Sequence, residues 1–532
     1  MKTFQIVVLI SFISITLTAQ EYHNPVIQGF NPDPSICRVD SDYYLVTSSF
    51  EYVPGIPVYH SRDLVNWKLI GHVLTRKSQI DFEGYKASEG VYAPTIRYNK
   101  GVFYVVVSIV KNPPPVKNII LTSKTPEGPW SDPVVLTDST LWHIDPSLFF
   151  DDDGKCYFTA NRRHQVEQPY SCYREIAIQE LDLGKMKLTG PIKVIGNGAL
   201  KDACTAEGPH IYKKDNRYYL LVSEGGTYIS HAVTMSSSDN IFGPYQQYPS
   251  NPVLTNRHLQ KTVPIRDVGH ADIVQTHNGE WWMVCLGVRF KNEISYMGRE
   301  TFLVPMIWEE NSFPVVSPAV GMVKEFHQLP AIAKKSNITR TAFHDDFNKD
   351  KIDMSWTFLR EPADFCEITK SGTLKINLKE STVSELTTPS FVGRRIENHD
   401  FRASLKMQFS ASTATEEAGL ILLSDNANYV KLTFSNQNLI LTEISGGKEN
   451  VFGRFDFIKD RDKYLRVESK NSKLDFYYSA DNKEWKTLKL NVPGATINNR
   501  TFTGSFVGFY GTSNKVKTNN YFEVDWFDYV NE

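Results

Sequence analysis

The chain has 532 residues, of which 12% are aromatic and 22% are charged, and its formal net charge at pH 7 is -2. This length is sufficient for two or more domains, each with its own core. A nearly neutral chain without a basic stripe has no long-range field that attracts nucleic acid, so we expect no nucleic-acid partner. The sequence indicates no particular oligomeric state.

Residues 1–20 have the pattern of a secretory signal peptide. An early Lys2 precedes an apolar run from Phe4 to Leu17, and small residues then lead to an expected cleavage site near Ala19. The alternative is a membrane anchor, but the run is shorter than the roughly 20 apolar residues of a spanning helix. No later apolar run is long enough to span a membrane. The segment therefore predicts a secreted or periplasmic protein.

Residues 21–327 contain one short pattern five times. Each copy has a small or acidic residue, then usually Pro, an aliphatic anchor, a polar turn and an aromatic-rich segment. The anchors are Ile36, Ile96, Leu148, Ile211 and Ile273. Repeats of roughly 60 residues that consist of strands and turns are typical of propeller blades.

A second pair of strand candidates follows each copy of the pattern. These pairs lie in residues 55–74, 118–136, 175–195, 231–254 and 300–323, and Gly, Pro, Asp and Asn bound them. No long stretch has helical periodicity. Four strands in each of five repeats predict a five-bladed β-propeller, in which the first strand of each blade lines the central channel. A larger sandwich is the alternative, which the regular spacing disfavours.

The six cysteines are too sparse for a disulfide scaffold. Cys37, Cys156 and Cys285 fall within the repeated units and are expected to be buried thiols. Cys172 and Cys204 fall in loop-like stretches and could pair, although the sequence does not fix this. No cysteine or histidine cluster has the spacing of a zinc site.

The repeat disappears after residues 328–343, which carry Pro, small residues and a basic pair and are expected to form a linker. Residues 344–532 contain short alternating segments at close intervals, such as 419–425, 464–470 and 521–530, which predict a β-sandwich. The opening segment HDDFNKDKIDMSWTFLREP resembles the start of jelly-roll, concanavalin-like modules. The predicted fold class is all-β, with a propeller followed by a sandwich.

Three repeats place a carboxylate where the channel-lining strand is expected to begin: Asp33, Asp145 and Glu207. Glycoside hydrolysis needs two carboxyl groups, one to protonate the leaving oxygen and one to activate water or attack carbon. Asp33 and Glu207 belong to the first and fourth repeats and would face each other across the axis. Asp145 would lie beside Glu207 and raise its pKa. The alternative is that these acids cap turns, as Asp often does before Pro.

Six segments in order resemble the landmarks of glycoside hydrolase family 43: NPDPSI, YAPTIRY, IDPSLFFDDDGKCYF, AEGPHIYKKDNRYYLLVSEGGT, GHADIV and GRETF. The resemblance extends from about residue 24 to the end and includes the family's C-terminal sandwich. It implies that Asp33 is the general base, Asp145 the residue that orients the acid and modulates its pKa, and Glu207 the general acid. The family inverts the anomeric configuration, so these two catalytic groups should lie roughly 6.5–9.5 Å apart.

Residues 48–76 resemble the β-xylosidases and α-L-arabinofuranosidases of this family, many of which cleave both sugars. The expected activity is exo-acting release of terminal L-arabinofuranose, D-xylose or both from plant hemicellulose such as arabinoxylan, xylo-oligosaccharides or arabinan. One alternative is an endo-arabinanase-like hydrolase, which would need an open groove and usually lacks the appended sandwich. Another is a non-catalytic carbohydrate-binding protein, which would be expected to have lost at least one of the three acids.

Aromatic side chains are candidates for stacking on the sugar, although such residues often simply fill blade interfaces. They are Phe30, Phe50, Tyr92 and Trp142. In related two-domain enzymes an aromatic residue of the second domain reaches the rim of the site. By this resemblance, Phe506 or a neighbour is expected to close the pocket on one side.

Arg289 resembles the family arginine that hydrogen-bonds substrate hydroxyls, and it could also hold Glu207 or Asp33 in place. His270 takes the position of Asp33 in the fifth repeat and resembles the histidine at the channel centre that sometimes supports an ion; a structural role in the core is the alternative. Arg299 and Glu300 are expected to pair near the rim or to cap a strand.

The loop before the expected acid, LKDACTAEGPH, carries Lys201 and Asp202 and lacks a Trp that many relatives have there, which leaves the sugar preference open. Asp151-Asp152-Asp153-Gly154 has some likeness to a calcium loop but fits a β-turn. We therefore expect that catalysis requires no cofactor and predict no metal ligand; a structural calcium ion is the alternative.

Overall fold

The computed structural model describes residues 20–112, 116–138, 144–163, 170, 172–200, 204–335, 342–459, 462–498 and 501–532. The expected signal peptide lies outside these residues apart from Gln20, as do Trp142, Lys201 and Asp202. Within the described chain nearly all regular structure is β-strand, with short 3-10 helices at Arg257–Thr262 and Gly494–Ile497. No helix among the described residues has the length and apolar character needed to cross a membrane.

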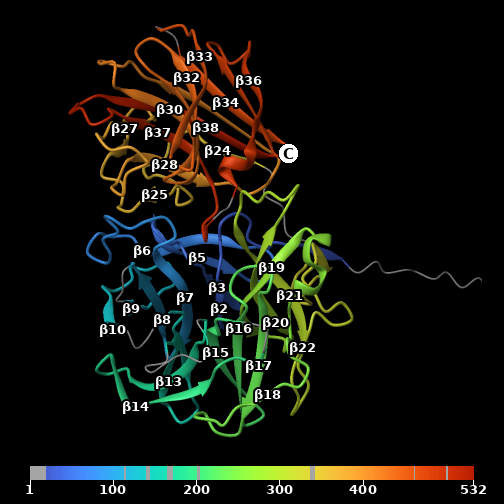
Figure 1. Ribbon diagram of the computed structural model, residues 1–532. Helices are drawn as coiled ribbons and strands as arrows, with labels where there is room; N and C mark the ends of the chain where they lie inside the picture. The colour runs from blue at the N-terminus through green and yellow to red at the C-terminus, as the bar shows by residue number, and fades with distance from the viewer. Residues whose placement is uncertain are drawn as a thin grey trace, which may run out of the picture.

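The first half of the chain forms five antiparallel sheets of four strands each, which confirms the predicted propeller (Figure 1). Blade 1 consists of β2 (Ser35–Val39), β3 (Asp42–Val46), β5 (Gly55–Ser61) and β6 (Lys68–Leu74). Blade 2 consists of β7 (Gly90–Asn99), β8 (Val102–Val110), β9 (Lys117–Ser123) and β10 (Val134–Asp138). Blade 3 consists of β11 (Ser147–Phe150), β12 (Cys156–Arg162), β13 (Glu175–Asp182) and β14 (Lys187–Gly196). Blade 4 consists of β15 (Glu207–Lys214), β16 (Arg217–Glu224), β17 (Ala232–Ser238) and β18 (Gln246–Gln247). Blade 5 consists of β19 (Ile265–Gln275), β20 (Trp281–Arg289), β21 (Arg299–Ile307) and β22 (Val315–Val316).

The first strands of the blades form a closed ring, because β2 contacts β7, β7 contacts β11, β11 contacts β15, β15 contacts β19 and β19 contacts β2. Blades that stack on both faces bury both faces of their inner strands. This explains the nearly continuous apolar sequences VFYVVVSIV of β8 and WWMVCLGVR of β20. The repeated aromatic-rich segments of the sequence are these second strands.

The segment before blade 1 closes the ring against the end of blade 5. Strand β1 (Glu21–His23) pairs with β23 (Phe326–Gln328). The Asn24 amide group donates to the Leu303 carbonyl oxygen at 2.8 Å and accepts a hydrogen bond from the Leu303 N–H at 3.0 Å. Residues from the two ends of the propeller are therefore held together by backbone pairing and by one buried amide.

A polar network crosses the channel and joins all five blades. Asp272 of blade 5 accepts hydrogen bonds from Ser35 Oγ of blade 1 at 2.7 Å and from Arg97 Nη1 of blade 2 at 2.8 Å. Nδ1 of His210 in blade 4 lies 2.9 Å from Arg97 Nη2 and 2.9 Å from Oγ of Ser147 in blade 3. Asp272 is fully buried, so its charge depends on these partners.

The second half of the chain forms a β-sandwich, as the alternating segments predicted. One sheet consists of β26 (Cys366–Ile368), β27 (Leu374–Asn377), β38 (Tyr521–Asn531), β29 (Phe401–Gln408), β34 (Lys463–Lys470), β35 (Lys473–Ser479) and β36 (Lys486–Pro493), with β24 (Ala342–Asp345) also paired to β38. The other consists of β28 (Ser390–Arg395), β37 (Phe506–Thr512), β30 (Glu417–Asp425), β31 (Asn428–Phe434), β32 (Leu439–Ser445) and β33 (Lys448–Phe455). The last two residues of the expected linker, Ala342 and Phe343, belong to β24.

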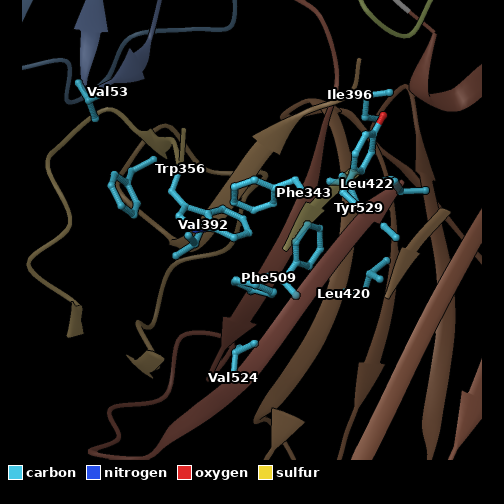
Figure 2. Close-up of a cluster of buried hydrophobic side chains, with 14 of the residues drawn as sticks. Val53, Phe343, Trp356, Val392, Ile396, Leu420, Leu422, Phe509, Val524 and Tyr529 are labelled. Atoms are coloured by element: carbon cyan, nitrogen blue, oxygen red, sulfur yellow. The ribbon is translucent and has the colours of Figure 1, made fainter. Parts of the chain in front are cut away.

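The two domains lie one above the other and share a hydrophobic interface (Figure 1). Strand β4 (Tyr52–Val53) of the propeller pairs with β25 (Phe358–Leu359) of the sandwich. Figure 2 shows Val53 near the sandwich core around Trp356 and Phe509. Because the interface has paired strands and a joint core, each domain covers apolar surface of the other.

We expect Asp272→Asn to destabilise the propeller. The substitution leaves the buried Arg97 without its carboxylate, and breaking a buried pair in this way costs about 3–5 kcal/mol of unfolding free energy. Urea unfolding followed by tryptophan fluorescence should show an earlier transition. Asp239→Asn is the matched control, because the side chain of Asp239 is 89% exposed and its pair with Arg217 is long at 3.4 Å. Equal midpoints for both variants would contradict the structural role of Asp272.

Candidate active site

Four of the five blades share one backbone conformation at the same repeat position, in or just before the first strand. Asp33, Asp145 and His270 each lie three positions before the anchor residue of their repeat. Their φ angles are 55°, 59° and 46°, and Gly208 at the same position of blade 4 has a φ of 58°. Non-glycine residues adopt this left-handed conformation rarely, and such residues cluster at functional sites. Glu207 precedes Gly208 directly and is the first residue of β15.

The three expected carboxylates surround one cavity of about 70 Å³ at the channel end of these strands. His270, Arg299 and aromatic side chains complete its wall. The lining residues are Asp33, Phe50, Tyr92, Ala93, Ile144, Asp145, Glu207, Thr227, His231, His270, Leu286, Arg299 and Phe502. The structure therefore brings together Asp33, Asp145 and Glu207 from blades 1, 3 and 4.

Asp33 is buried among hydrogen-bond donors. Arg299 Nη1 donates to Oδ1 of Asp33 at 2.7 Å, and Ser48 Oγ donates to Oδ2 at 2.6 Å. His270 Nδ1 lies 3.8 Å from Oδ1. A cation and a hydroxyl donor are the surroundings that an ionised carboxylate requires. This carboxylate is therefore suited to accept a proton from water.

Glu207 lies in an environment that favours its protonated form. Its burial and the negative charge of Asp33 raise its pKa to about 7, although the guanidinium groups of Arg299 and Arg174 act in the other direction. The side chain is only partly buried, so it can reach a molecule in the cavity. A carboxylic acid that keeps its proton near neutral pH is suited to protonate a leaving group.

Asp145 connects these two groups. Its burial and the charges of Glu207 and Asp33 raise its pKa well above the ordinary value. Oδ2 of Asp145 accepts a hydrogen bond from the Gly208 N–H at 3.1 Å. Since Gly208 follows Glu207 in the chain, this contact fixes the backbone that carries the acid.

Three expected substrate contacts lie away from the cavity. Phe30 and Phe506 are fully buried between the domains, with ring centroids 6.2 Å apart. Arg289 forms a two-point ion pair with Glu300, at 2.6 and 2.9 Å, and donates to the Glu397 carbonyl oxygen at 2.9 Å. These residues lie at the interface between the two domains and do not line the cavity.

The expected pairing of Arg299 with Glu300 is wrong. Consecutive residues of a strand point to opposite faces, and both residues lie in β21. Arg299 consequently points toward Asp33, whereas Glu300 points toward Arg289. Arg299 is the cavity arginine, and the alternation of the GRETF strand is the signal that could have identified it.

Phe502 is the aromatic residue of the second domain that lines the cavity. Both Nε and Nη2 of Arg299 donate to its carbonyl oxygen at 3.2 Å, and Oγ of Ser88 accepts a hydrogen bond from its N–H at 3.0 Å. The arginine that pairs with Asp33 is therefore held by the sandwich domain. Phe50 and Tyr92 also line the cavity, as expected.

A disulfide joins Cys172 and Cys204, whose Cα atoms are 5.2 Å apart. Cys204 lies three residues before Glu207, and the Thr205 N–H donates to the Cys172 carbonyl oxygen at 3.0 Å. The disulfide thus anchors the loop that leads to the acid. Cys37, Cys156 and Cys285 are buried free thiols.

His270 lines the cavity. In the described part of the chain it belongs to no group of three Asp, Glu, His or Cys side chains whose ligand atoms lie close enough together to bind one ion. Among the described residues, Asp81, Glu83 and Glu361 do form a group of this kind, but Glu361 already pairs with Lys77 at 2.5 Å. The protein side chains around His270 therefore do not form a multi-ligand metal site of this kind.

The chain resembles known proteins over almost its whole length. The xylosidase/arabinosidase of Butyrivibrio fibrisolvens is 38% identical over 95% of this chain and 98% of the relative. The non-reducing end alpha-L-arabinofuranosidase BoGH43B of Bacteroides ovatus is 34% identical over 97% of this chain and 96% of the relative. The solved Bacteroides ovatus xyloglucan PUL GH43B has a TM-score of 0.87 at 34% identity and covers 96% of this chain and 100% of its own. The xylan beta-1,4-xylosidase from Bacillus halodurans C-125 has a TM-score of 0.87 at 30% identity, with the same coverage of 96% and 100%.

Family models account for both domains. Residues 344–530 match the beta xylosidase C-terminal concanavalin A-like domain, which agrees with the sandwich. Residues 22–314 match the model of glycosyl hydrolases family 43. With the three carboxyl groups around one cavity of the propeller, the chain belongs to glycosyl hydrolases family 43 and is a glycoside hydrolase.

Proposed function

We propose that this enzyme is an exo-acting, inverting glycoside hydrolase that releases terminal L-arabinofuranose, D-xylose or both from plant hemicellulose. The observation that carries the proposal is the small cavity, about 70 Å³, with Asp33, Asp145 and Glu207 in its wall and Phe502 of the second domain beside them. An endo-acting enzyme needs an open groove, which this cavity does not resemble. A non-catalytic binding protein would not need an acid with a raised pKa opposite a carboxylate held by donors.

In the proposed reaction Glu207 and Asp33 act on the two sides of the glycosidic bond. Glu207 donates its proton to the glycosidic oxygen as the bond to the anomeric carbon breaks. Asp33 takes a proton from a water molecule, whose oxygen bonds to the anomeric carbon from the opposite face. The product sugar has inverted configuration, and the proton on Asp33 replaces, through solvent, the one that Glu207 gave up. Side chains supply every step, so we propose that no cofactor is required.

The names of the relatives support both sugars as substrates. One relative is a xylosidase/arabinosidase, and another is named for the release of arabinofuranose from the non-reducing end. D-Xylopyranose and L-arabinofuranose can present hydroxyl groups in similar places, so one pocket can accept both.

We further propose that the enzyme is secreted or periplasmic. The pattern of residues 1–20 supports this, as does the disulfide between Cys172 and Cys204, because disulfides persist in oxidising compartments. A nucleic-acid partner is not part of the proposal, since the net charge is -2.

The proposed function is tested with nitrophenyl β-D-xylopyranoside and nitrophenyl α-L-arabinofuranoside. We expect hydrolysis of one or both, with terminal sugars as the first products from oligosaccharides. Proton NMR of the reaction at early times should show the inverted anomer. A retained anomer would exclude the single displacement, and internal cleavage of arabinan without release of monosaccharide would favour the endo-acting alternative.

We expect Glu207→Gln to reduce activity on xylobiose or arabino-oligosaccharides about 10²–10⁴-fold, the usual contribution of a general acid. The loss should be much smaller on dinitrophenyl glycosides, because their leaving groups need little protonation. Steady-state kcat/KM values for both substrate types provide the measurement. Glu309→Gln, at an exposed position in the propeller, is the control and should leave both values unchanged. Equal losses on both types would show that Glu207 is not the acid.

The pH dependence of kcat/KM should fall on the basic side with a midpoint near the pKa of Glu207, about 7, because the acid is active only when protonated. Arg174 favours the ionised form of Glu207 through its positive charge. Arg174→Met should therefore raise the pKa of Glu207 and move the basic limb to higher pH. Arg62→Met is the control, since Arg62 is exposed and pairs with Asp42. A limb that stays in place or moves to lower pH would contradict this electrostatic assignment.

A further inference from the structure

A second cavity, of about 590 Å³, lies between blade 1 and the sandwich. Its wall comes from residues 25–28 and 31, from the blade 1 residues Tyr59 and 65–69, and from residues 353–355, 394, 395 and 397 of the sandwich. Figure 1 shows β5 and β6 next to β25 and β28 at this boundary. No described residue lines both this cavity and the catalytic one. Asn31 lines the second cavity, and Asp33, two residues later, lines the first.

Arg395 is the unusual residue of this cavity. The side chain is only 7% exposed, and its Nε donates to the Phe30 carbonyl oxygen at 2.7 Å. Its Nη2 atom is buried without a hydrogen-bond partner among the described residues, which also provide no carboxylate paired with this guanidinium. A buried cation without an anion is costly, so the site favours an incoming negative charge.

Among the described residues neither carboxylate of the cavity forms an ion pair with Arg395; the charge of Glu397 acts on Arg395 without direct contact, and each carboxylate has another partner. Glu397 pairs with Arg394 Nη2 at 2.5 Å. Asp353 accepts hydrogen bonds from the N–H and Oγ of Ser355, at 3.0 and 2.7 Å. Lys68, exposed at the rim, adds a second positive charge. With Lys68, Arg394 and Arg395 against Asp353 and Glu397, three positive charges face two negative ones, so the net charge of the wall is positive.

Trp67 adds an aromatic surface beside these charges. Its indole N–H donates to the Leu64 carbonyl oxygen at 2.7 Å, so the polar edge of the ring is satisfied and the half-buried ring remains to line the cavity. Gln28 contributes a planar amide group, whereas the amide of Asn31 is already hydrogen-bonded to the Gln28 carbonyl oxygen and the Tyr59 hydroxyl group. Aromatic faces with amide and guanidinium donors around them suit the apolar face and the hydroxyl groups of a sugar.

We propose that this interdomain cavity is a second carbohydrate-binding site, selective for an oligosaccharide that carries a uronic acid. Trp67 stacks on a sugar ring, and the carboxylate of the uronic acid pairs with the positive charge of the Arg395 guanidinium, which lines the cavity. The choice of an oligosaccharide rests on the proposed function. The site would hold an acidic branch of the polymer next to the domain that cuts terminal sugars.

The test measures binding by isothermal titration calorimetry in the Asp33→Asn background, which prevents cleavage. The probes are xylotetraose, xylotetraose with one glucuronic acid substituent, free glucuronate and inorganic phosphate. We expect the acidic oligosaccharide to bind at two sites and the neutral one to occupy the second site at least tenfold more weakly. Binding of phosphate or glucuronate as tight as that of the acidic oligosaccharide would indicate a simple anion site and overturn the proposal.

Substitutions then locate the second site. Trp67→Ala should abolish the second binding event, whereas Trp485→Ala should retain it, because Trp485 stacks on Arg466 in the sandwich and does not line the cavity. Arg395→Met should remove the preference for the acidic oligosaccharide. If Arg395→Met does not fold, the Trp67 pair and the comparison of neutral with acidic probes still decide the question. A single binding event, or two events that Trp67→Ala leaves intact, would overturn the proposal.

The outcome is separable from that of the proposed function. Hydrolysis of the nitrophenyl glycosides by the unsubstituted enzyme, together with one binding event, would contradict only the second site. Two binding events without any hydrolysis would contradict only the proposed activity.

Discussion

The buried carboxylate of Asp272 is the constraint on which the propeller and its active site both depend. Its partners Ser35 and Arg97, and His210 and Ser147 beyond them, bring one residue from every blade into a single network. Asp33, Asp145, Gly208 and His270 lie two residues before Ser35, Ser147, His210 and Asp272 of this network, so they belong to the next layer of the same channel. The network under the catalytic layer therefore fixes where the first strands begin, and with them the positions of the acids relative to one another.

The second domain is part of the active site as well as a neighbour of it. Asp33 is oriented by Arg299, and Arg299 in turn donates two hydrogen bonds to the carbonyl oxygen of Phe502. The loop that contains Phe502 is placed by the hydrophobic interface around Phe30, Tyr52 and Phe506. Packing between the domains thus determines the position of Asp33, the proposed base, through Phe502 and Arg299.

The sequence made the propeller and its three acids predictable because both follow from a repeat. The number of blades follows from the number of repeats, and Asp33, Asp145 and Glu207 stand out as acidic exceptions at or beside one repeat position. Residues outside the repeat were harder to assign. Arg289 and Arg299 lie on neighbouring strands, and only the face to which each points separates a structural ion pair from the partner of Asp33. Phe502 and Phe506 lie four residues apart, and docking of the sandwich decides which one reaches the cavity. The disulfide between Cys172 and Cys204 spans 32 residues without a local signal.

The third carboxyl group, that of Asp145, lies beside two acids that the positive charge of Arg299 affects differently. Arg299 donates a hydrogen bond to Asp33, the proposed base, but its positive charge also lowers the pKa of Glu207, the proposed acid, which the proposed mechanism uses in its protonated form. Burial and the charge of Asp33 oppose this effect. Asp145 adds a second acid whose own pKa is raised by Glu207 and which holds Gly208, so the two side chains compete for protons within one buried space. A negative charge on one of them makes ionisation of the other less favourable. The proposed mechanism uses Glu207 in its protonated form, and burial together with the charge of Asp33 serves this by raising the pKa of Glu207 to about 7.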